Sequence, residues 1–190
     1  ADHDEAVVTN GMSCFARDGK NANSALVCSV SAEDFDGDPF KAMDFQEKIE
    51  HAAFVLGGGK APAQTVGAFL GGGASKFGRV EPTYARGVSE ADISSLFPAQ
   101  ITSVLRQGLL NFDKKLAGFA AEDSVLTAPE TRTSSPVRIV RSEASLEAVG
   151  AEGLFPCAEG AGYAGGIMSA AADGIRCAEK VLEKLGGGTV

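Results

Sequence analysis

The chain has 190 residues, of which 44% are hydrophobic and 22% are charged, and its formal net charge is −8. This composition is ordinary for a globular protein with a buried core, and no apolar run approaches the ~20 residues that a membrane-spanning helix needs. A nucleic-acid surface would need clustered Lys and Arg, which the acidic balance disfavours. We therefore expect neither a membrane nor a nucleic acid as partner.

The cysteines and histidines are few and scattered. The four cysteines are Cys14, Cys28, Cys157 and Cys177, and they form no C-x-x-C pair. This favours free thiols in a reducing cytoplasm over a disulfide framework or a zinc site. With only His3 and His51 present, we expect no metal site and no Ser-His-Asp hydrolase. The chain opens without Met and without a signal peptide, which predicts a cytoplasmic chain that is processed or is a piece of a longer protein.

The first third of the chain is predicted to hold strands followed by a helix. Strands are expected over residues 7–9 and 24–30, where β-branched residues are bounded by Asn, Gly and Asp, and a loop follows over residues 31–38. A helix is expected from residue 38 or 39 to about 56, because its apolar residues follow a helical period. Three consecutive glycines stop it.

The next segments alternate between helix and strand signals. A short helix is expected over residues 63–70 and a capped turn over residues 89–97. A longer helix should run from residue 99 to about 119. Strands are expected over residues 125–127, 137–140 and 154–157, and a final helix over residues 167–185.

This order of elements predicts the fold class. The elements do not alternate as βαβα, so a free-standing Rossmann domain is not expected. We predict an α+β fold, in which a β-rich framework with strands at about 7–30 and 124–140 receives a helical insert at about 39–119.

The most informative motif is a glycine turn, residues 159–166, between the last predicted strand and the last helix. A strand, a glycine-rich turn and a helix N-terminus together are typical of a site for phosphate or another anion. Gly160, Gly162 and Gly165 match the G-x-G-x-x-G dinucleotide fingerprint. No second strand follows, so the turn can be only the last strand–helix unit of a nucleotide-binding domain. A plain β–α turn with extra glycines is the alternative.

Two further features suggest a contact or a binding role. Ala170, Gly174 and Ala178 form a small-residue stripe, which predicts close packing of the final helix, although an ordinary Ala-rich helix would look the same. Arg132 and Arg138 lie in a polar segment, residues 131–138, where they could grip an anionic substrate or belong to a solvated hairpin.

Asn10 and Met12 could contact a planar ligand, or they could simply belong to a turn. We interpret Cys157 as a small core residue at the end of the last strand.

At these same segments the sequence resembles a family of bacterial FAD-dependent dehydrogenases, also called NAD(FAD)-utilising dehydrogenases. They are two-domain flavoproteins with a glutathione-reductase-like FAD fold. The segments similar to the middle region of the family are residues 7–13, 15–19, 21–26, 60–64 and 130–138. Residues 154–174 resemble the segment that returns to the FAD domain, with Cys157 where the family often has Ala.

The resemblance implies that the chain is the C-terminal part of a longer FAD-dependent oxidoreductase. Residues 1–150 would be a substrate or cap region, and residues 151–190 would be the last β–α unit of an FAD-binding Rossmann-like domain. That domain's N-terminal portion and a small-molecule substrate would be the partners, and NAD(P) could exchange electrons with the flavin. This part alone should bind FAD weakly and be inactive, and no catalytic residue is assigned.

The resemblance also implies which residues contact the flavin. They are Glu159, Gly160, Gly162, Tyr163, Ala164, Gly165, Gly166 and Ile167. Glu159 would face the ribityl hydroxyls, and the backbone from Gly162 to Ile167 would face the pyrophosphate or the flavin ring. Arg132 and Arg138 would lie on the substrate side. The alternative from a different class is a non-catalytic ligand-binding or interaction domain whose glycine turn binds a phosphate.

Overall fold

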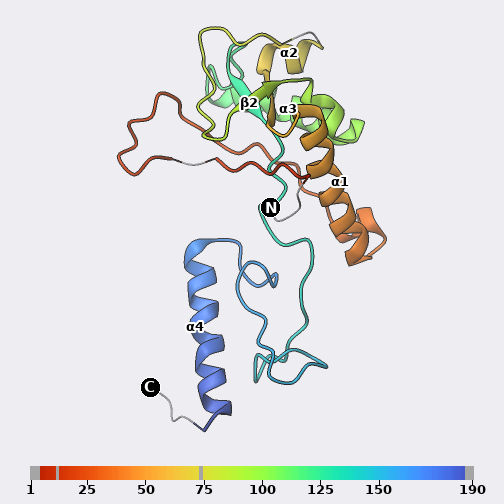
Figure 1. The fold of residues 1–190 in the computed structure, drawn as a ribbon, viewed down its shortest axis with the longest axis vertical. Coiled ribbons are helices and arrows are strands. Elements are labelled where there is room, and N and C mark those ends of the chain that lie inside the picture. Colours follow the sequence, from red (N-terminus) through yellow and green to blue (C-terminus); the bar gives the residue numbers. More distant parts are fainter. Residues whose placement is uncertain (1–4, 12, 73–74, 187–190) are drawn as a thin grey trace. The chain divides into compact units, whose positions relative to one another are not determined.

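The computed structural model describes residues 5–11, 13–72 and 75–186. Its internal contacts divide the chain into two compact units (Figure 1). The sheet unit comprises residues 1–34 and 44–131, and the C-terminal unit comprises residues 35–43 and 132–190. No helix in the described part of the chain is both long and apolar enough to cross a membrane. Met12, one of the predicted ligand contacts, lies outside the described residues.

A small mixed sheet forms the centre of the sheet unit. Strand β1 (Ala61–Thr65) lies between β2 (Val88–Glu90), which is parallel to it, and β3 (Val125–Thr127), which is antiparallel. All five β1 residues are buried. Their side chains are small or polar, so the neighbouring helices can pack closely over the strand.

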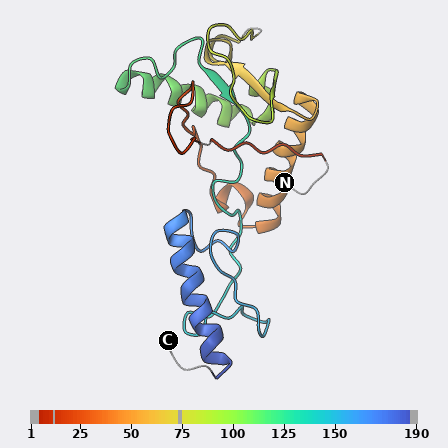
Figure 2. The same cartoon turned by 60° about the vertical axis from the view of Figure 1, so that its left-hand side comes forward.

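Helices cover this sheet and supply most of the core. They are α1 (Pro39–Gly57), α2 (Val66–Gly71) and α3 (Ala99–Lys115), with short 3₁₀ turns η1 (Ala32–Phe35) and η2 (Ile93–Leu96) (Figure 2). Phe69 of α2 and Leu109 of α3 are the largest fully buried apolar side chains, and Ala53 of α1 packs in the same cluster. Thr65 caps α2 by accepting the Ala68 N–H through its hydroxyl.

The N-terminal segment joins this core without entering the sheet. The Val7 N–H donates to the Glu50 carbonyl of α1 at 3.1 Å, and the Thr9 N–H donates to the Pro129 carbonyl at 2.8 Å. These partners lie in the interior of α1 and in a loop, so no strand ladder forms, and the strand predicted over residues 7–9 is wrong. The strand predicted over residues 24–30 is also wrong, since that segment is mostly exposed and belongs to no sheet.

The α+β class is confirmed by four helices and a mixed sheet in the described residues. Helices α1 and α3 confirm the two long helices, although α3 ends at Lys115 rather than near residue 119. The strand at residues 125–127 is confirmed as β3. The short helix begins later than predicted, at Val66, because the preceding residues form β1. Both β1 and β2 are absent from the sequence-based prediction.

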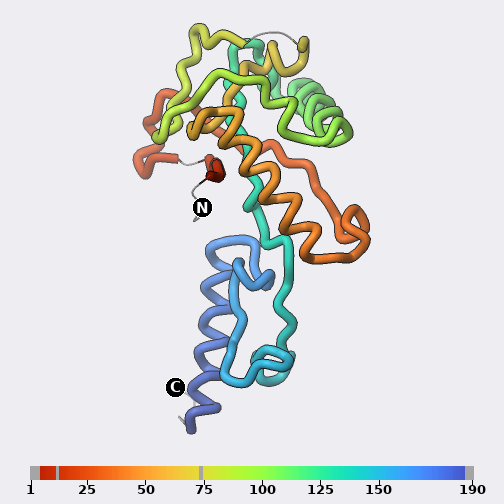
Figure 3. Tube along the Cα trace, turned by 45° about the vertical axis from the view of Figure 1, so that its right-hand side comes forward, coloured from red at the N-terminus to blue at the C-terminus, as the bar shows by residue number. Residues whose placement is uncertain are grey.

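The C-terminal unit contains one long helix, α4 (Ile167–Lys184), beside an extended chain (Figure 3). The helix predicted there is confirmed. The strands predicted over residues 137–140 and 154–157 are wrong. In the first segment, the Ile139 N–H donates to the Ala161 carbonyl and the Val140 carbonyl accepts the Val149 N–H, and the neighbouring Arg141 forms an isolated bridge with Ala148. The second contains Pro156, which has no N–H to donate to a ladder.

Candidate functional site

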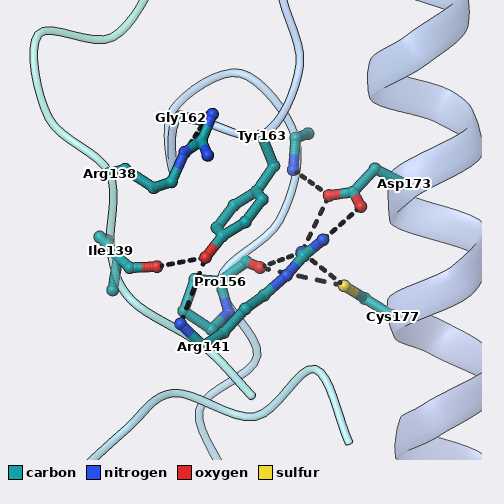
Figure 4. A network of polar contacts seen from close by, with 9 residues as sticks. Arg138, Ile139, Arg141, Pro156, Gly162, Tyr163, Asp173 and Cys177 are labelled. Atoms are coloured by element: carbon teal, nitrogen blue, oxygen red, sulfur yellow. Dashed lines mark hydrogen bonds and ion pairs between the residues drawn. The ribbon is translucent and has the colours of Figure 1, made fainter. Parts of the chain in front are cut away.

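The glycine turn packs against the polar segment that precedes it in the C-terminal unit (Figure 4). Gly162 has a φ of +80°, and a Cβ built there would lie 2.5 Å from the Val137 carbonyl oxygen. The Arg138 Nε donates to the Gly162 carbonyl at 2.9 Å, and the Ser135 hydroxyl donates to the Gly160 carbonyl at 3.3 Å. Gly162 is therefore required by both its backbone conformation and this close approach.

Tyr163 anchors the same turn from within. Its hydroxyl donates to the Ile139 carbonyl at 3.0 Å and accepts the Arg141 N–H at 3.2 Å. Its ring faces the Arg141 guanidinium, 3.6 Å from the ring centroid, and the Arg138 guanidinium, 5.1 Å away. A cation over an aromatic face is attracted by the ring quadrupole. The side chain of Tyr163, a predicted cofactor contact, is thus engaged within its own unit.

A buried ion pair fixes the turn to α4. The Arg141 guanidinium donates two hydrogen bonds to Asp173, at 2.6 and 3.0 Å, and a third to the Pro156 carbonyl at 2.6 Å. The side chains of Arg141 and Asp173 are only 6% and 8% exposed. Such a forked pair is stronger and more directional than a single ionic contact. We call Arg141 and Asp173 the clamp.

Asp173 also binds Ala158, the residue that precedes the glycine turn. The Ala158 N–H donates to the Asp173 carboxylate at 2.9 Å, and the Ala158 carbonyl accepts the Tyr163 N–H at 2.9 Å. Ala158 reaches both partners from a left-handed conformation, with φ of +59°, which is costly for a residue with a Cβ. The hydrogen bond from Arg141 chiefly, with the one from Ala158, lowers the Asp173 pKa from 3.8 to about 2 despite burial. The carboxylate therefore stays ionised throughout the physiological range.

The C-terminal end of α4 is held by a second set of ion pairs. Lys184 pairs with Glu147 and Glu152 in the loop that precedes the turn. The Gly153 N–H and Lys184 lower the Glu147 pKa. Together with the clamp, these contacts hold α4 against the extended chain at two levels.

The N-terminus of α4 is open to approach. Gly166 is the N-cap residue, its backbone is extended, and no side chain in the described part of the chain caps the helix. A Cβ at Gly165 would meet none of the described atoms within 4 Å, and the next residue, Ile167, is 89% exposed. Unlike Gly162, Gly165 is not required by packing or by a left-handed conformation. The first-turn amides of α4 can therefore receive an anion here.

The remaining turn residues have mixed surroundings. Glu159 and Gly160 are exposed, while Ala164 is half-buried. The geometry brings the predicted contacts from Glu159 to Ile167 together at one end of α4. Their contact with a flavin stays a prediction.

The predicted packing stripe on α4 is wrong. Ala178 is exposed, and a Cβ at Gly174 would meet no described atom within 4 Å. The buried residues of the helix are instead Asp173 and Cys177. The contact face is set by the ion pair with Arg141 rather than by small residues.

The predicted substrate residues are dispersed. Asn10 is exposed in the sheet unit, whereas Arg132 and Arg138 are exposed in the C-terminal unit. Arg138 contacts the glycine turn, where its guanidinium supports Gly162 and Tyr163. A substrate role for any of these residues stays a prediction.

The interpretation of Cys157 as a core residue is wrong. Cys157 is exposed, because the strand that would have buried it does not form, and Cys177 is the buried cysteine. Arg141, Asp173 and Cys177 also belong to the site, although none of them is among the residues predicted from the sequence. One signal was present: Asp173 and Cys177 are one helical turn apart, and Asp173 is the only acidic residue in the Ala-rich first half of the helix.

Comparison with known proteins identifies the family. Residues 1–133 match the model of the family described as "FAD-dependent protein, C-terminal domain-like". The chain belongs to this family. The expected relationship to the C-terminal region of an FAD-dependent protein is thereby confirmed, whereas membership of the NAD(FAD)-utilising dehydrogenases and the glutathione-reductase-like fold stay predictions.

A relative extends the comparison beyond the matched domain. An uncharacterised protein from Clostridium beijerinckii is 50% identical over 188 residues, which is 97% of this chain and 35% of that protein. The FAD-dependent C-terminal domain-like chain therefore spans about a third of its relative's length. The similarity reaches both units, whereas the family model ends just after the sheet unit.

Proposed function

We propose that this chain is the C-terminal part of an FAD-dependent oxidoreductase, in which the glycine turn and the N-terminus of α4 contact the cofactor. The observation that carries the proposal is the open, uncapped N-terminus of α4 beside Gly165, on a turn that the clamp holds in place. Membership of a family named for FAD dependence supports the choice of cofactor. Residues 1–150 would contribute the substrate side.

The donor groups at this end of α4 suit the pyrophosphate of FAD. That group is an anion, and the amides at Gly166 and Ile167 lie where the helix dipole favours negative charge. The exposed carboxylate of Glu159 would accept hydrogen bonds from the ribityl hydroxyls. FAD would supply the hydride chemistry, and these residues would bind and orient it. Arg138, Tyr163 and the clamp would keep the turn in its binding conformation.

The N-terminal part of the same polypeptide is the partner that we propose for α4. Met168, Ile175 and Leu182 recur at every seventh position and are all exposed, so they form an apolar stripe on the face away from Asp173. We call this the α4 stripe. The greater length of the relative, of which this chain covers 35%, supports the presence of such a segment. An exposed apolar stripe of this kind favours burial against another surface.

The central test replaces Gly165 by Val in the full-length protein. A branched side chain there would obstruct the approach to the amides, and its Cβ would meet no described atom of the chain within 4 Å. We expect normal circular dichroism and FAD occupancy reduced about 10- to 100-fold, as expected from the loss of one or two charged hydrogen bonds. Gly78→Val is the matched control, because Gly78 is also exposed and open. Full flavin retention in the Gly165 variant would show that the turn is only a scaffold.

A spectroscopic titration separates the proposal from its alternative. Purified full-length protein should acquire the visible absorption of bound flavin when FAD is added. Protein that stays colourless after the titration would instead support a non-catalytic ligand-binding domain. NAD(P) as electron partner would then be tested by flavin reduction in the absence of oxygen.

A further inference from the structure

Two of the four cysteines meet at the clamp. Cys177 is buried on α4, and its thiol lies 3.9 Å from the Pro156 carbonyl oxygen. Cys157, the residue that directly follows Pro156, is exposed. Cys14 and Cys28 belong to the other unit. Cysteines that are distant in the sequence are therefore adjacent at the entrance to the glycine turn.

The surroundings give the two thiols different access to reagents. Cys157 can be reached from solvent, whereas Cys177 is covered by the chain. The charged groups that face Cys177 are Arg141, whose guanidinium is 3.2 Å from the sulfur, and Asp173, one helical turn away. Burial raises the Cys177 pKa, and the guanidinium opposes that effect. An exposed thiol backed by a second thiol beside a cation is the arrangement of an attacking and a resolving cysteine.

We propose that Cys157 and Cys177 are a redox dithiol that closes to a disulfide on reaction with a low-molecular-weight disulfide. The Cys157 thiolate attacks one sulfur of the reagent, forms a mixed disulfide and expels one thiolate. The Cys177 thiolate then attacks the Cys157 sulfur, forms the protein disulfide and expels the second thiolate. The two protein thiols lose two protons and two electrons, and the reagent gains them as two thiols. Oxidation thus links the entrance of the glycine turn covalently to α4.

A reversible dithiol of this kind differs from a permanent structural disulfide. In a reducing cytoplasm, dithiols of this kind are transient and serve redox sensing or catalysis. The new bond would join the same two segments that the clamp joins, so the oxidised and reduced proteins would share one fold. The proposal goes beyond flavin binding and stands without it.

The test equilibrates the full-length protein with mixtures of oxidised and reduced glutathione, traps free thiols with an alkylating reagent, and digests with trypsin without reduction. Cleavage after Arg141, Arg176 and Lys180 places Cys157 in peptide 142–176 and Cys177 in peptide 177–180. We expect a linked pair of these two peptides to exceed any other disulfide of the protein by about tenfold or more, because the Cys177 thiol lies beside the carbonyl of the residue that precedes Cys157. Cys14 and Cys28 should remain alkylated.

Two variants test whether Cys177 is the resolving thiol. In Cys177→Ser the resolving thiol is missing, so Cys157 should accumulate as its glutathione adduct, about tenfold more than in the wild type. Cys28→Ser is the control and should leave the linked pair unchanged. If Cys177→Ser does not fold, the wild-type peptide measurement decides alone. The proposal is overturned if Cys157 in the wild type stops at the glutathione adduct, pairs with another cysteine, or stays reduced at every glutathione ratio.

Discussion

Arg141 combines several contacts that no other side chain could make from the same position. Its planar guanidinium binds Asp173 through two nitrogens, reaches the Pro156 carbonyl, and lies over the Tyr163 ring. A lysine ammonium is a point charge and cannot satisfy a forked carboxylate and an aromatic face together. The position of the glycine turn therefore depends on one arginine outside the turn.

Replacement of Arg141 should be strongly destabilising. Arg141→Ala leaves the Asp173 carboxylate buried without its cation, which costs about 3–5 kcal/mol in free energy of unfolding. Urea denaturation would measure this loss in the free energy of unfolding. Arg138→Ala is the control, because Arg138 is exposed and its loss should cost about 1 kcal/mol or less. Equal midpoints for the two variants would contradict the role assigned to the clamp.

The low Asp173 pKa predicts a stability that depends on acid pH. Because the folded pKa is about 2 and the unfolded value is 3.8, the stabilisation is complete above about pH 4 and is lost as the pH falls through about 2. The corresponding change is about 1–2 kcal/mol. We expect the stability difference between wild type and Asp173→Asn to shrink by this amount from about pH 5 to about pH 2, in urea titrations at each pH. A constant difference would exclude an ionised Asp173 as its source.

The two kinds of glycine in the turn should respond differently to the same mutation. Gly162→Ala places a Cβ against the Val137 carbonyl at a residue with a left-handed backbone conformation. We therefore expect the free energy of unfolding to fall by about 1–3 kcal/mol. Gly165→Ala meets open space and should leave stability within about 0.5 kcal/mol of the wild type. Thermal unfolding of both variants would measure the contrast. Similar losses at both positions would contradict the described geometry of the turn.

Replacement of Gly174, which the sequence predicted to lie at a packing contact of α4, should stabilise the helix. Gly174 lies inside the helix with open space around its Cβ position, so Gly174→Ala should stabilise the chain by roughly 0.5–1 kcal/mol through helix propensity. Gly174→Leu should also be tolerated, contrary to the packing expected from the small-residue stripe. Circular dichroism melts would show it. A large loss with Leu in the full-length protein would mean that another segment packs on this face.

The elements that the sequence predicted well are those with a local cause. Helical periodicity located α1 and α3, and the glycines located the N-terminus of α4. Strand β1 was missed because Ala-Pro-Ala-Gln-Thr lacks the β-branched and aromatic residues typical of strands. Residues 24–30 and 137–140 carry that signal, but no neighbouring strand pairs with them. Strand formation depends on partners that lie elsewhere in the chain.

The residues of the site, like the secondary-structure elements, could be predicted only where the sequence signal is local. The glycine turn is a continuous motif, so its residues could be found by reading along the sequence. The clamp joins residues 141 and 173 across an intervening turn, and Cys177 of α4 lies beside Pro156, the residue that precedes Cys157. A pairing of this kind has no periodic or local signature, and it becomes visible only in three dimensions.

The α4 stripe makes a prediction about the full-length protein. If the N-terminal part covers Ile175, then Ile175→Glu should lower the free energy of unfolding by about 1.5–3 kcal/mol, the value of burying one large apolar side chain. Val55→Glu is the matched control, since Val55 is a similarly exposed residue of α1. Thermal unfolding of both variants would test it. No difference between Ile175→Glu and the wild type would show that the stripe faces solvent in the whole protein.

The hydrogen bonds that close the sheet unit determine when it can fold during synthesis. The Thr9 N–H and hydroxyl both bind the Pro129 carbonyl, 120 positions further along the chain. A ribosome must therefore release residues beyond Pro129 before the first segment can reach its place. Until then, the Thr9 backbone and the edge of β1 that pairs with β3 lack their partners and are open to chaperones and proteases. A nascent chain that stalls before β3 should accordingly be degraded rather than stored as a folded half.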